Sequence, residues 1–376
     1  MISEFFPTGK DLRFTGGVEA RTFYIAKYLS KNHKITILTT RLKGSKEKEQ
    51  MFNFRVIRAG RPQDYKAAAI GIVARLSFIK NAIAKSREID ADIVEGTNFI
   101  THFIALWIAT KKNIPRVAWY PDVWIGSWIK NTGIVGPFGG ALERLNLKIG
   151  FSAYIAISRQ TKRKLAGYIK KKIHIIPCGV DLSEFKVAKS NAQKKQNTII
   201  CISRLAKYKN ISDLIFAYAL LRKKEKYLSL VIIGRGPQEK ELKDLVKNLK
   251  LGRQVKFLSN LSRGQLIRQL VTSTIFCQPS RVEGFGISVV EAAAAGTPYV
   301  VSDIPVFREI TKNGQGGIFF RQEDILDLAS KIKKLLTDLS LYRKKVKEGV
   351  SLAKIYQWQS LAKKTEMVYL SLKQHS

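Results

Sequence analysis

The stretch Ser280–Asp303 reads SRVEGFGISVVEAAAAGTPYVVSD, and the order of its elements decides the fold. An apolar run before it, Thr274–Gln278, predicts a strand, and a glycine-containing turn leads into small and apolar residues that predict a helix at about 287–295. A second β-branched run, Tyr299–Val301, predicts the next strand. Strand, turn, helix and strand in this order form a βαβ unit, which indicates a parallel sheet covered by helices.

The same alternation continues on both sides of this unit. After residue 197 the predicted strands are 198–202, 228–233, 255–258, 274–278, 299–301 and 317–320, with further helices at 211–222, 238–247 and 264–270. Before residue 183 the predicted strands are 34–40, 54–57, 92–95, 116–120, 153–157 and 173–176, with helices at 18–30, 66–85 and 99–111 and one from 159. We therefore predict two Rossmann-like α/β domains facing a central cleft, with ligands at the carboxyl ends of the strands.

The break between the two series is Ser183–Asn197, which is polar, charged and weakly periodic and is predicted to be a linker. This places the first domain at 1–182 and the second at 198–354. Because only Met1–Phe6 precedes the first loop, the first strand is predicted to be short, or its beginning is missing from the sequence.

Composition excludes several classes of protein. The 376 residues are 45% hydrophobic, enough for a sizeable core, which excludes disordered and collagen-like chains. Lys and Arg total 66 and Asp and Glu 29, so the net charge of +37 should attract nucleic acid, anionic lipid headgroups or phosphorylated substrates. Nucleic-acid binding is the alternative function from another class, but the sequence contains no known recognition module and its basic residues are spread throughout.

Cysteine and histidine placement indicates neither a metal site nor a redox site. The cysteines are too far apart for a C-x-x-C motif and are interpreted as buried thiols of a reducing compartment, and the histidines show no metal-ligand spacing. These residues are Cys178, Cys201, Cys277, His33, His102, His174 and His375. The N-terminus has no signal-peptide pattern, and uncharged runs are shorter than the roughly 20 residues of a spanning helix, so we expect a cytoplasmic protein.

One segment, Lys66–Lys85, is both amphipathic and basic. It is expected either to pack on the sheet as an ordinary helix or to dock on an anionic membrane surface from the cytoplasmic side. The sequence leaves both readings open.

The turn at 283–287 joins a predicted strand to a helix. Such a turn presents backbone N–H groups and the positive end of a helix to a phosphate or diphosphate. Glu283 lies in this turn, and Glu291 follows eight residues later in the helix. Carboxylates beside a phosphate site suit sugar hydroxyls, which donate strongly to charged acceptors. The alternative is that both are ordinary loop and surface charges.

A second loop follows the strand at 198–202. It carries Ser203, Arg204 and Lys209, and the two cations are placed to neutralise a leaving diphosphate. Gly234 begins a G-x-G turn after the next strand, a weak signal that a plain tight turn also explains.

Two further candidates lie in the first half of the chain. Gly16 and Gly17 precede the first long helix and permit close approach of a ligand to the backbone. Asp122 follows the strand at 116–120, where it would accept a proton from an acceptor hydroxyl or simply cap a turn.

Together these motifs resemble glycosyltransferase family 4, retaining enzymes of the GT-B fold that use nucleotide-sugar donors. The strongest match is the E-x7-E element from Glu283 to Glu291. It is accompanied, in the family's order, by GGVEARTFYIAKYL from Gly16, IIPCGVDLSEF from Ile175, SRLAKYKN from Ser203 and VIIGRGP from Val231. The resemblance spans nearly the whole chain, although the family usually has Asn where Cys178 stands.

The resemblance implies a role for each matched position. Arg204 and Lys209 would contact the donor diphosphate, Glu283 the transferred sugar and Glu291 the ribose hydroxyls. The loop at 16–17 would close over donor and acceptor. The remaining implied donor contacts are Ser203, Gly234, Gly284, Phe285, Gly286 and Ile287.

Two parts of the first domain also follow from the resemblance. Many relatives carry a His after the central strand, where this chain has Tyr120-Pro121-Asp122, so Asp122 is the candidate for activating the acceptor. The last helix, at 355–376, would cross back onto the first domain.

The implied reaction moves a hexose-type sugar from a nucleoside diphosphate to a hydroxyl of a glycan, lipid-linked or polysaccharide acceptor, with retention at the anomeric carbon. Arg204, Lys209 and helix N-termini would stabilise the leaving diphosphate, so neither a divalent metal nor another cofactor is expected. A sugar-nucleotide epimerase or a phosphorylase of the same fold is the alternative chemistry.

Overall fold

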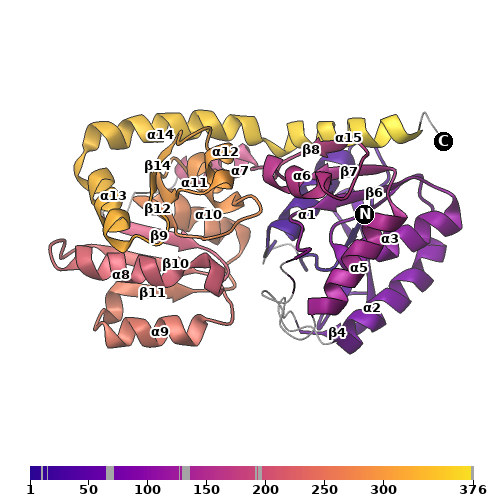
Figure 1. Ribbon diagram of the computed structural model, residues 1–376, viewed down its shortest axis with the longest axis horizontal. Coiled ribbons are helices and arrows are strands. Elements are labelled where there is room, and N and C mark those ends of the chain that lie inside the picture. The colour runs from indigo at the N-terminus through magenta and orange to yellow at the C-terminus, as the bar shows by residue number, and fades with distance from the viewer. Residues whose placement is uncertain are drawn as a thin grey trace. The chain divides into compact units, whose positions relative to one another are not determined.

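The computed structural model describes residues 1–9, 12–14, 16–64, 72–126, 128, 136–190, 193 and 197–373. The chain divides into two compact units, both of the α/β class (Figure 1). Unit 1 comprises Met1–Cys178 and Trp358–Ser376, and unit 2 comprises Gly179–Gln357.

The described residues of unit 1 form one sheet of eight strands in the order β3-β4-β2-β1-β5-β6-β7-β8. All neighbours are parallel except β3, which pairs antiparallel with β4 at the edge. The sequence analysis missed β3 because its residues, KEQM, lack the apolar character of a buried strand. The strands are β1 Ile2–Ser3, β2 Thr36–Leu42, β3 Lys48–Met51, β4 Phe54–Gln63, β5 Val94–Gly96, β6 Arg116–Tyr120, β7 Ala153–Ala156 and β8 Ile173–Ile175.

Helices cover both faces of this sheet. Figure 1 shows α15 on one side of it and α2 and α5 on the other. α15, from the end of the chain, packs on α1, where the rings of Trp358 and Tyr24 stack with centroids 5.3 Å apart. The helices among the described residues of unit 1 are α1 Gly17–Leu29, α2 Ile72–Lys85, η1 Ser86–Glu88, α3 Phe99–Lys112, α5 Gly136–Ile149, α6 Arg159–Ala166 and α15 Trp358–Lys373.

Unit 2 has a six-stranded sheet in the order β11-β10-β9-β12-β13-β14, parallel throughout. Its central strands are apolar runs because helices bury them from both sides. The strands are β9 Thr198–Ile202, β10 Ser229–Ile233, β11 Val255–Leu258, β12 Ile275–Gln278, β13 Tyr299–Ser302 and β14 Gly317–Phe320.

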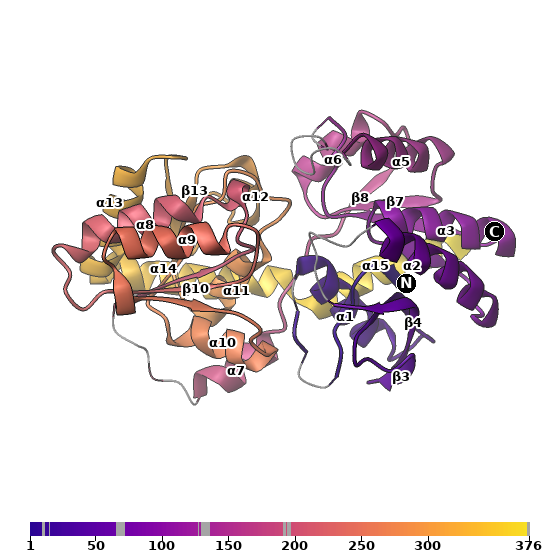
Figure 2. The ribbon, with the colours of Figure 1, turned by 90° about the horizontal axis from the view of Figure 1, so that it is seen from below.

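Figure 2 shows α8, α9 and α13 over one face of the second sheet, with α7 and α10 over the other. α11 packs on α10 and on the long helix α14. The helices of unit 2 are α7 Leu182–Ser190, η3 Lys207–Lys209, α8 Ile211–Arg222, α9 Glu239–Asn248, η4 Gly252–Gln254, α10 Arg263–Thr272, α11 Ile287–Ala295, α12 Pro305–Ile310, α13 Ile325–Thr337, α14 Leu339–Ala353 and η5 Lys354–Tyr356.

The strand order of each unit reverses at one point. In unit 2 the chain leaves β9 towards β10 and leaves β12 towards β13, although β9 and β12 are neighbours. The loops after these two strands therefore turn to opposite faces, which opens a crevice at their carboxyl ends, the usual place for a ligand in such sheets. In unit 1 the reversal falls between β1 and β5.

The predicted linker at 183–197 needs correction. Its first half is the helix α7, which packs on α10 and α11 as part of unit 2. Phe185 is buried there, and Lys189 donates to the carbonyl oxygen of Ala294 at 2.9 Å. A nine-residue helix with one buried aromatic residue has too weak an apolar period to be recognised in the sequence.

Candidate functional site

The centre of the candidate site is an ion pair between Lys209 and Glu283 in unit 2. Lys209 ends the short helix η3 after β9, and Glu283 lies in the loop after β12. The Nζ of Lys209 donates to Oε1 of Glu283, and the two side chains are 12% and 10% exposed. The loops that meet at the strand reversal thus bring together two residues 74 positions apart. Because both are partly exposed, they can contact a ligand.

A network of neutral side chains supports Glu283. Its Oε1 accepts from the hydroxyl of Ser280 at 3.0 Å and from the amide of Gln278 at 3.4 Å. Gln278, the last residue of β12, also donates to the hydroxyls of Ser203 and Ser280 at 3.1 and 2.8 Å. Gln278 and Ser280 were not among the predicted site residues, although Gln278 ends the strand predicted at 274–278 and Ser280 lies between this strand and Glu283. Ser203, predicted to contact the donor, belongs to this network.

Arg204 and Gly234 lie on adjacent loops. Arg204 is exposed, in the same loop as Lys209. Gly234 has a φ of +155°, and a Cβ added there would lie 1.9 Å from the carbonyl oxygen of Ser203, so only glycine lets the two loops pack together. This packing explains Gly234 without a ligand, and its contact with a donor stays a prediction.

The next part of the candidate site is the N-terminus of α11. Gly286 is the residue before the helix, has a φ of +90°, and makes no side-chain cap hydrogen bond to the first turn. Phe285 is buried against Tyr356 with ring centroids 5.8 Å apart, which fixes the turn that also contains Gly284. The first backbone N–H groups of α11, from Ile287 onward, therefore lie at a helix end without a capping side chain.

Glu291, the second carboxylate of the E-x7-E element, is buried on α11. It accepts from Nη1 of Arg263, the first residue of α10, while Nε of Arg263 donates to Glu184 on α7 at 3.0 Å. Arg263 was not among the predicted site residues, because nothing in the local sequence distinguishes it from the other arginines.

In unit 1 the glycine pair begins α1 as predicted. Gly16 has an extended backbone and is exposed, and a Cβ added there would meet no heavy atom within 4 Å among the residues that the structure describes. The fold of unit 1 therefore does not itself require glycine at 16. Closure of the loop at 16–17 over a ligand stays a prediction.

Asp122 lies just after β6 and is held by its neighbours. Its Oδ1 accepts from the backbone N–H of Val123 at 2.8 Å and from Nζ of Lys164 at 2.7 Å. Asp122 therefore stabilises a turn and forms an ion pair with Lys164. Its activation of an acceptor stays a prediction.

Two carboxylates of unit 1 were missed by the sequence analysis. Glu4 follows β1 at the strand reversal, is 8% exposed, and accepts from Asn98 at 2.8 Å and from Arg75 at 3.1 Å. Glu143 on α5 is buried and accepts from Nε1 of Trp128 at 2.7 Å, and burial raises the pKa of its carboxyl. Glu4 lies in the short run Met1–Phe6 before the first loop, where no motif marks it.

The described residues contain neither a candidate metal site nor a membrane-spanning helix. No group of three or more His, Cys, Asp or Glu side chains gathers there as a metal-ion site. No helix among them has the length and apolar character needed to cross a membrane. The cysteines are buried thiols, and burial raises the pKa of Cys201 to about 12.

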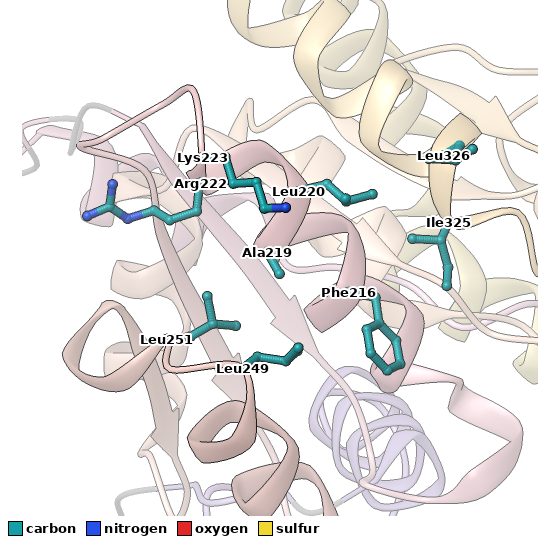
Figure 3. A pocket seen from close by; sticks show the side chains of 9 residues that line it. All are labelled: Phe216, Ala219, Leu220, Arg222, Lys223, Leu249, Leu251, Ile325 and Leu326. Carbon is teal, nitrogen blue, oxygen red and sulfur yellow. The ribbon is translucent and has the colours of Figure 1, made fainter.

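A separate surface hollow of ≈ 670 Å³ lies on the α8 face of unit 2. Figure 3 shows Phe216 and Leu220 of α8 there, with Leu249 and Leu251 from the segment after α9 and Leu326 of α13. None of its lining residues belongs to the Lys209–Glu283 network, so this hollow is not part of the candidate site.

Comparison with known families matches both halves of the chain. The family described as "Glycosyltransferase Family 4" matches residues 15–184, and "Glycosyl transferases group 1" matches residues 183–351. The second match contains the whole network around Lys209 and Glu283.

Curated relatives agree with these matches. The chain is 30% identical over 203 residues to a glycogen synthase of Mycobacterium tuberculosis (strain CDC 1551 / Oshkosh), covering 54% of this chain and 49% of that protein, so it spans about half that relative's length. It is 24% identical over 316 residues to alpha-monoglucosyldiacylglycerol synthase of Acholeplasma laidlawii, covering 78% and 79%. These matches do not favour the nucleic-acid-binding, epimerase or phosphorylase alternatives.

Solved structures share the fold over the whole chain. Sucrose-phosphate synthase from Thermosynechococcus elongatus has a TM-score of 0.84 at 18% identity, covering 99% of this chain and 98% of that one. The Anabaena protein HepE, in complex with UDP-glucose, has a TM-score of 0.75 at 17% identity, covering 98% of each chain. Two Rossmann-like units give the chain the GT-B fold, and its similarity to glycosyltransferase family models extends over residues 15–351.

Proposed function

We propose that the protein transfers a sugar from a nucleoside diphosphate to a hydroxyl group of a glycan, lipid-linked or polysaccharide acceptor, with retention at the anomeric carbon. The observation that carries this proposal is the Lys209–Glu283 pair at the strand reversal of unit 2, with Arg204 in the same loop as Lys209. Cations beside a carboxylate fit a substrate that joins a diphosphate to a hydroxyl-rich ring.

The difficult step in such a transfer is the separation of charge. As the bond from the anomeric carbon to the diphosphate oxygen breaks, the sugar becomes cationic and the diphosphate gains negative charge. Arg204, Lys209 and the N-terminus of α11 supply positive groups for the diphosphate, and Glu283 faces the sugar. The departing phosphate oxygen then takes the proton of the acceptor hydroxyl on the same face of the sugar, so the mechanism needs no separate base.

The relatives support a nucleotide-sugar donor. HepE is described in complex with UDP-glucose, and the curated relatives carry the names of a glycogen synthase and a glucosyldiacylglycerol synthase. We extend this to a nucleoside diphosphate sugar as the donor of this chain. The cationic groups named above replace a divalent ion in the mechanism, so we propose a reaction without a metal cofactor.

A donor screen tests this function. UDP, GDP, ADP and their sugars are added to the protein in a thermal-shift assay, and we expect one nucleotide family to raise the melting temperature. With that sugar nucleotide and a glycan or lipid acceptor, free nucleoside diphosphate should form only when acceptor is present. Transfer should continue in EDTA, and NMR should show the donor's anomeric configuration in the product.

Other outcomes would reject the proposal. Release of a sugar phosphate would indicate a phosphorylase, and conversion of the donor without an acceptor would indicate an epimerase. Loss of transfer in EDTA would contradict the metal-free mechanism but leave the class of reaction intact.

We also propose that unit 1 binds the cytoplasmic face of an anionic membrane, where a lipid-linked acceptor would be found. The part of the predicted amphipathic segment before residue 72 lies outside the described residues, and the remainder is α2. Val73 and Leu76 of α2 are 68% and 55% exposed, and Phe138 of α5 is 71% exposed. α2 contains no acidic residue, and the one acid of α5, Glu143, is buried. Both helices contact α3.

Replacing Val73 and Leu76 together by glutamate is expected to lower binding to vesicles with anionic lipid by at least about 10-fold. Each substitution removes an apolar side chain from the interface and adds a repelled charge. Co-sedimentation with vesicles of increasing phosphatidylglycerol content measures the effect. Leu326→Glu is the control, because Leu326 is 72% exposed on α13 of unit 2. Equal binding of the double variant and the wild type would contradict docking through α2.

A further inference from the structure

Arg263 links two carboxylates that lie on different helices of unit 2. Its Nη1 donates to Oε1 of Glu291 on α11, and its Nε donates to Oε2 of Glu184 on α7 at 3.0 Å. The side chains of Arg263 and Glu291 are 9% and 8% exposed. The guanidinium also lies over the ring of Phe185, 5.6 Å from its centroid. Arg263 is therefore fixed on several sides.

Arg263, Glu184 and Glu291 together carry one positive and two negative charges. Two carboxylates share one guanidinium, and Glu291 and Arg263 are both largely removed from water. A carboxylate in such a place is stable only when its oxygens accept hydrogen bonds from charged or polar donors. Arg263 donates to Oε1 of Glu291 and so fixes the direction in which this carboxylate points.

We propose that Arg263 is a positioning residue that holds Glu291 in the orientation needed to accept hydrogen bonds from the ribose hydroxyls of the donor. This inference rests on the proposed function and on the ribose contact that the family resemblance implies for Glu291. Arg263 acts through Glu291 and does not itself touch the reacting atoms. Its contact with α7 fixes the guanidinium, because a planar fork bound at Nε as well as Nη1 cannot rotate freely.

The geometry requires arginine at this position. A lysine carries the same charge but presents a single ammonium group on a flexible stem, so it would pair with one carboxylate and leave the orientation of the other unfixed. A glutamine keeps polar atoms but removes the positive charge that Arg263 presents to both carboxylates. Arg263→Lys keeps the charge and changes the geometry, whereas Arg263→Gln removes the charge. Comparing the two variants therefore separates the contribution of geometry from that of charge.

The test compares nucleotides with and without ribose hydroxyls. The probe is the nucleoside diphosphate, among UDP, GDP and ADP, that gives the largest thermal shift, together with its 2′,3′-dideoxy counterpart. In the wild type the dideoxy compound should bind about 10- to 100-fold more weakly, the usual effect of losing hydrogen bonds to a charged group. In Arg263→Gln this ratio of dissociation constants should fall below about 3-fold, and in Arg263→Lys it should lie between the two.

Two control variants separate positioning from general disruption of unit 2. Arg268→Gln changes an exposed arginine on the same helix and should keep the wild-type ratio. Glu184→Gln removes the charge on α7 but keeps a side-chain oxygen that can accept from Nε of Arg263, so it should also keep most of the wild-type ratio. Circular dichroism and thermal melting check that each variant is folded, and Arg263→Lys provides the measurement if Arg263→Gln does not fold.

The outcomes distinguish this inference from the proposed function. If Arg263→Gln and Arg263→Lys keep the wild-type ratio, Arg263 does not position Glu291, while nucleotide binding stands. If Glu184→Gln lowers the ratio as much as Arg263→Gln, the effect comes from the packing of α7, and the inference is also rejected. If the wild type binds the nucleotide and its dideoxy counterpart equally well, the ribose contact of Glu291 is rejected. If the wild type binds none of the nucleotides, the proposed function itself is rejected.

Discussion

Replacing Lys209 by alanine is expected to slow sugar transfer by about 100- to 1,000-fold, the usual cost of removing one preorganised donor from a developing negative charge. Lys209 is 12% exposed and pairs with Glu283 at the strand reversal of unit 2. In the proposed reaction, its ammonium group would stabilise the leaving diphosphate more than solvent does, because little water reaches the site. The effect should appear in kcat, because this charge develops in the transition state.

The variant should remain folded. Without Lys209, the carboxylate of Glu283 keeps hydrogen bonds from Ser280 at 3.0 Å and Gln278 at 3.4 Å, and it is partly exposed to water. Thermal melting followed by circular dichroism distinguishes a folded variant with slow transfer from a variant that has lost its structure. Lys207→Ala is the matched control, because Lys207 is exposed in the same short helix, η3, and its removal should leave transfer unchanged.

Glu283→Ala should also abolish most transfer in a folded protein, and the double variant should be little worse than either single one. Residues that act as a pair lose their effect together, so their contributions to the barrier are not additive. Near wild-type turnover in Lys209→Ala or in Glu283→Ala would contradict the roles assigned to this pair.

Much of this site could be predicted because strand periodicity fixes where the loops lie. Apolar runs at 198–202 and 274–278 place the residues that follow them at the carboxyl edge of a parallel sheet. Arg204, Lys209 and Glu283 follow those runs, and the structure brings Lys209 and Glu283 into contact. The strand reversal between β9 and β12 explains why these two loops meet rather than any others.

The supporting residues could not be predicted, because their partners lie far along the chain. Arg263 is 79 residues from Glu184 and 28 from Glu291, and Glu4 is 94 residues from Asn98. In a chain with 66 basic residues, no local feature distinguishes Arg263, which joins the carboxylates of Glu291 and Glu184. Such contacts depend on which helices pack together, and periodicity does not specify that.

The polar stretch after residue 182 was misread for a related reason. Helix α7 has Phe185 as its buried residue and is held by polar contacts to α10 and α11. Helix α7 is stabilised by tertiary contacts rather than by an apolar stripe. Its composition alone therefore predicts a linker.

A second large effect is expected in unit 1, where Arg21→Met should lower the free energy of unfolding by about 3–5 kcal/mol. Arg21 of α1 and Glu95 of β5 are 2% and 1% exposed and form a two-pronged ion pair, with Nη2 to Oε2 at 2.9 Å. The hydroxyl of Tyr369 on α15 also donates to Glu95, at 2.7 Å, and the guanidinium lies 4.9 Å from the ring centroid of Trp119. Removing the arginine leaves a buried carboxylate without its counter-charge, which costs far more than a lost surface contact.

Chemical denaturation followed by tryptophan fluorescence measures the change in stability, and hydrogen exchange should show lower protection in α1 and α15, which the ion pair and Tyr369 connect. Arg41→Met is the matched control, because Arg41 forms an exposed pair with Glu47 at 3.3 Å and should cost less than about 1 kcal/mol. Arg21→Met combined with Glu95→Met should recover part of the loss, since an apolar pair leaves no unpaired charge. A loss below about 1 kcal/mol in Arg21→Met would show that water or another donor reaches Glu95, and it would contradict the role assigned to this ion pair.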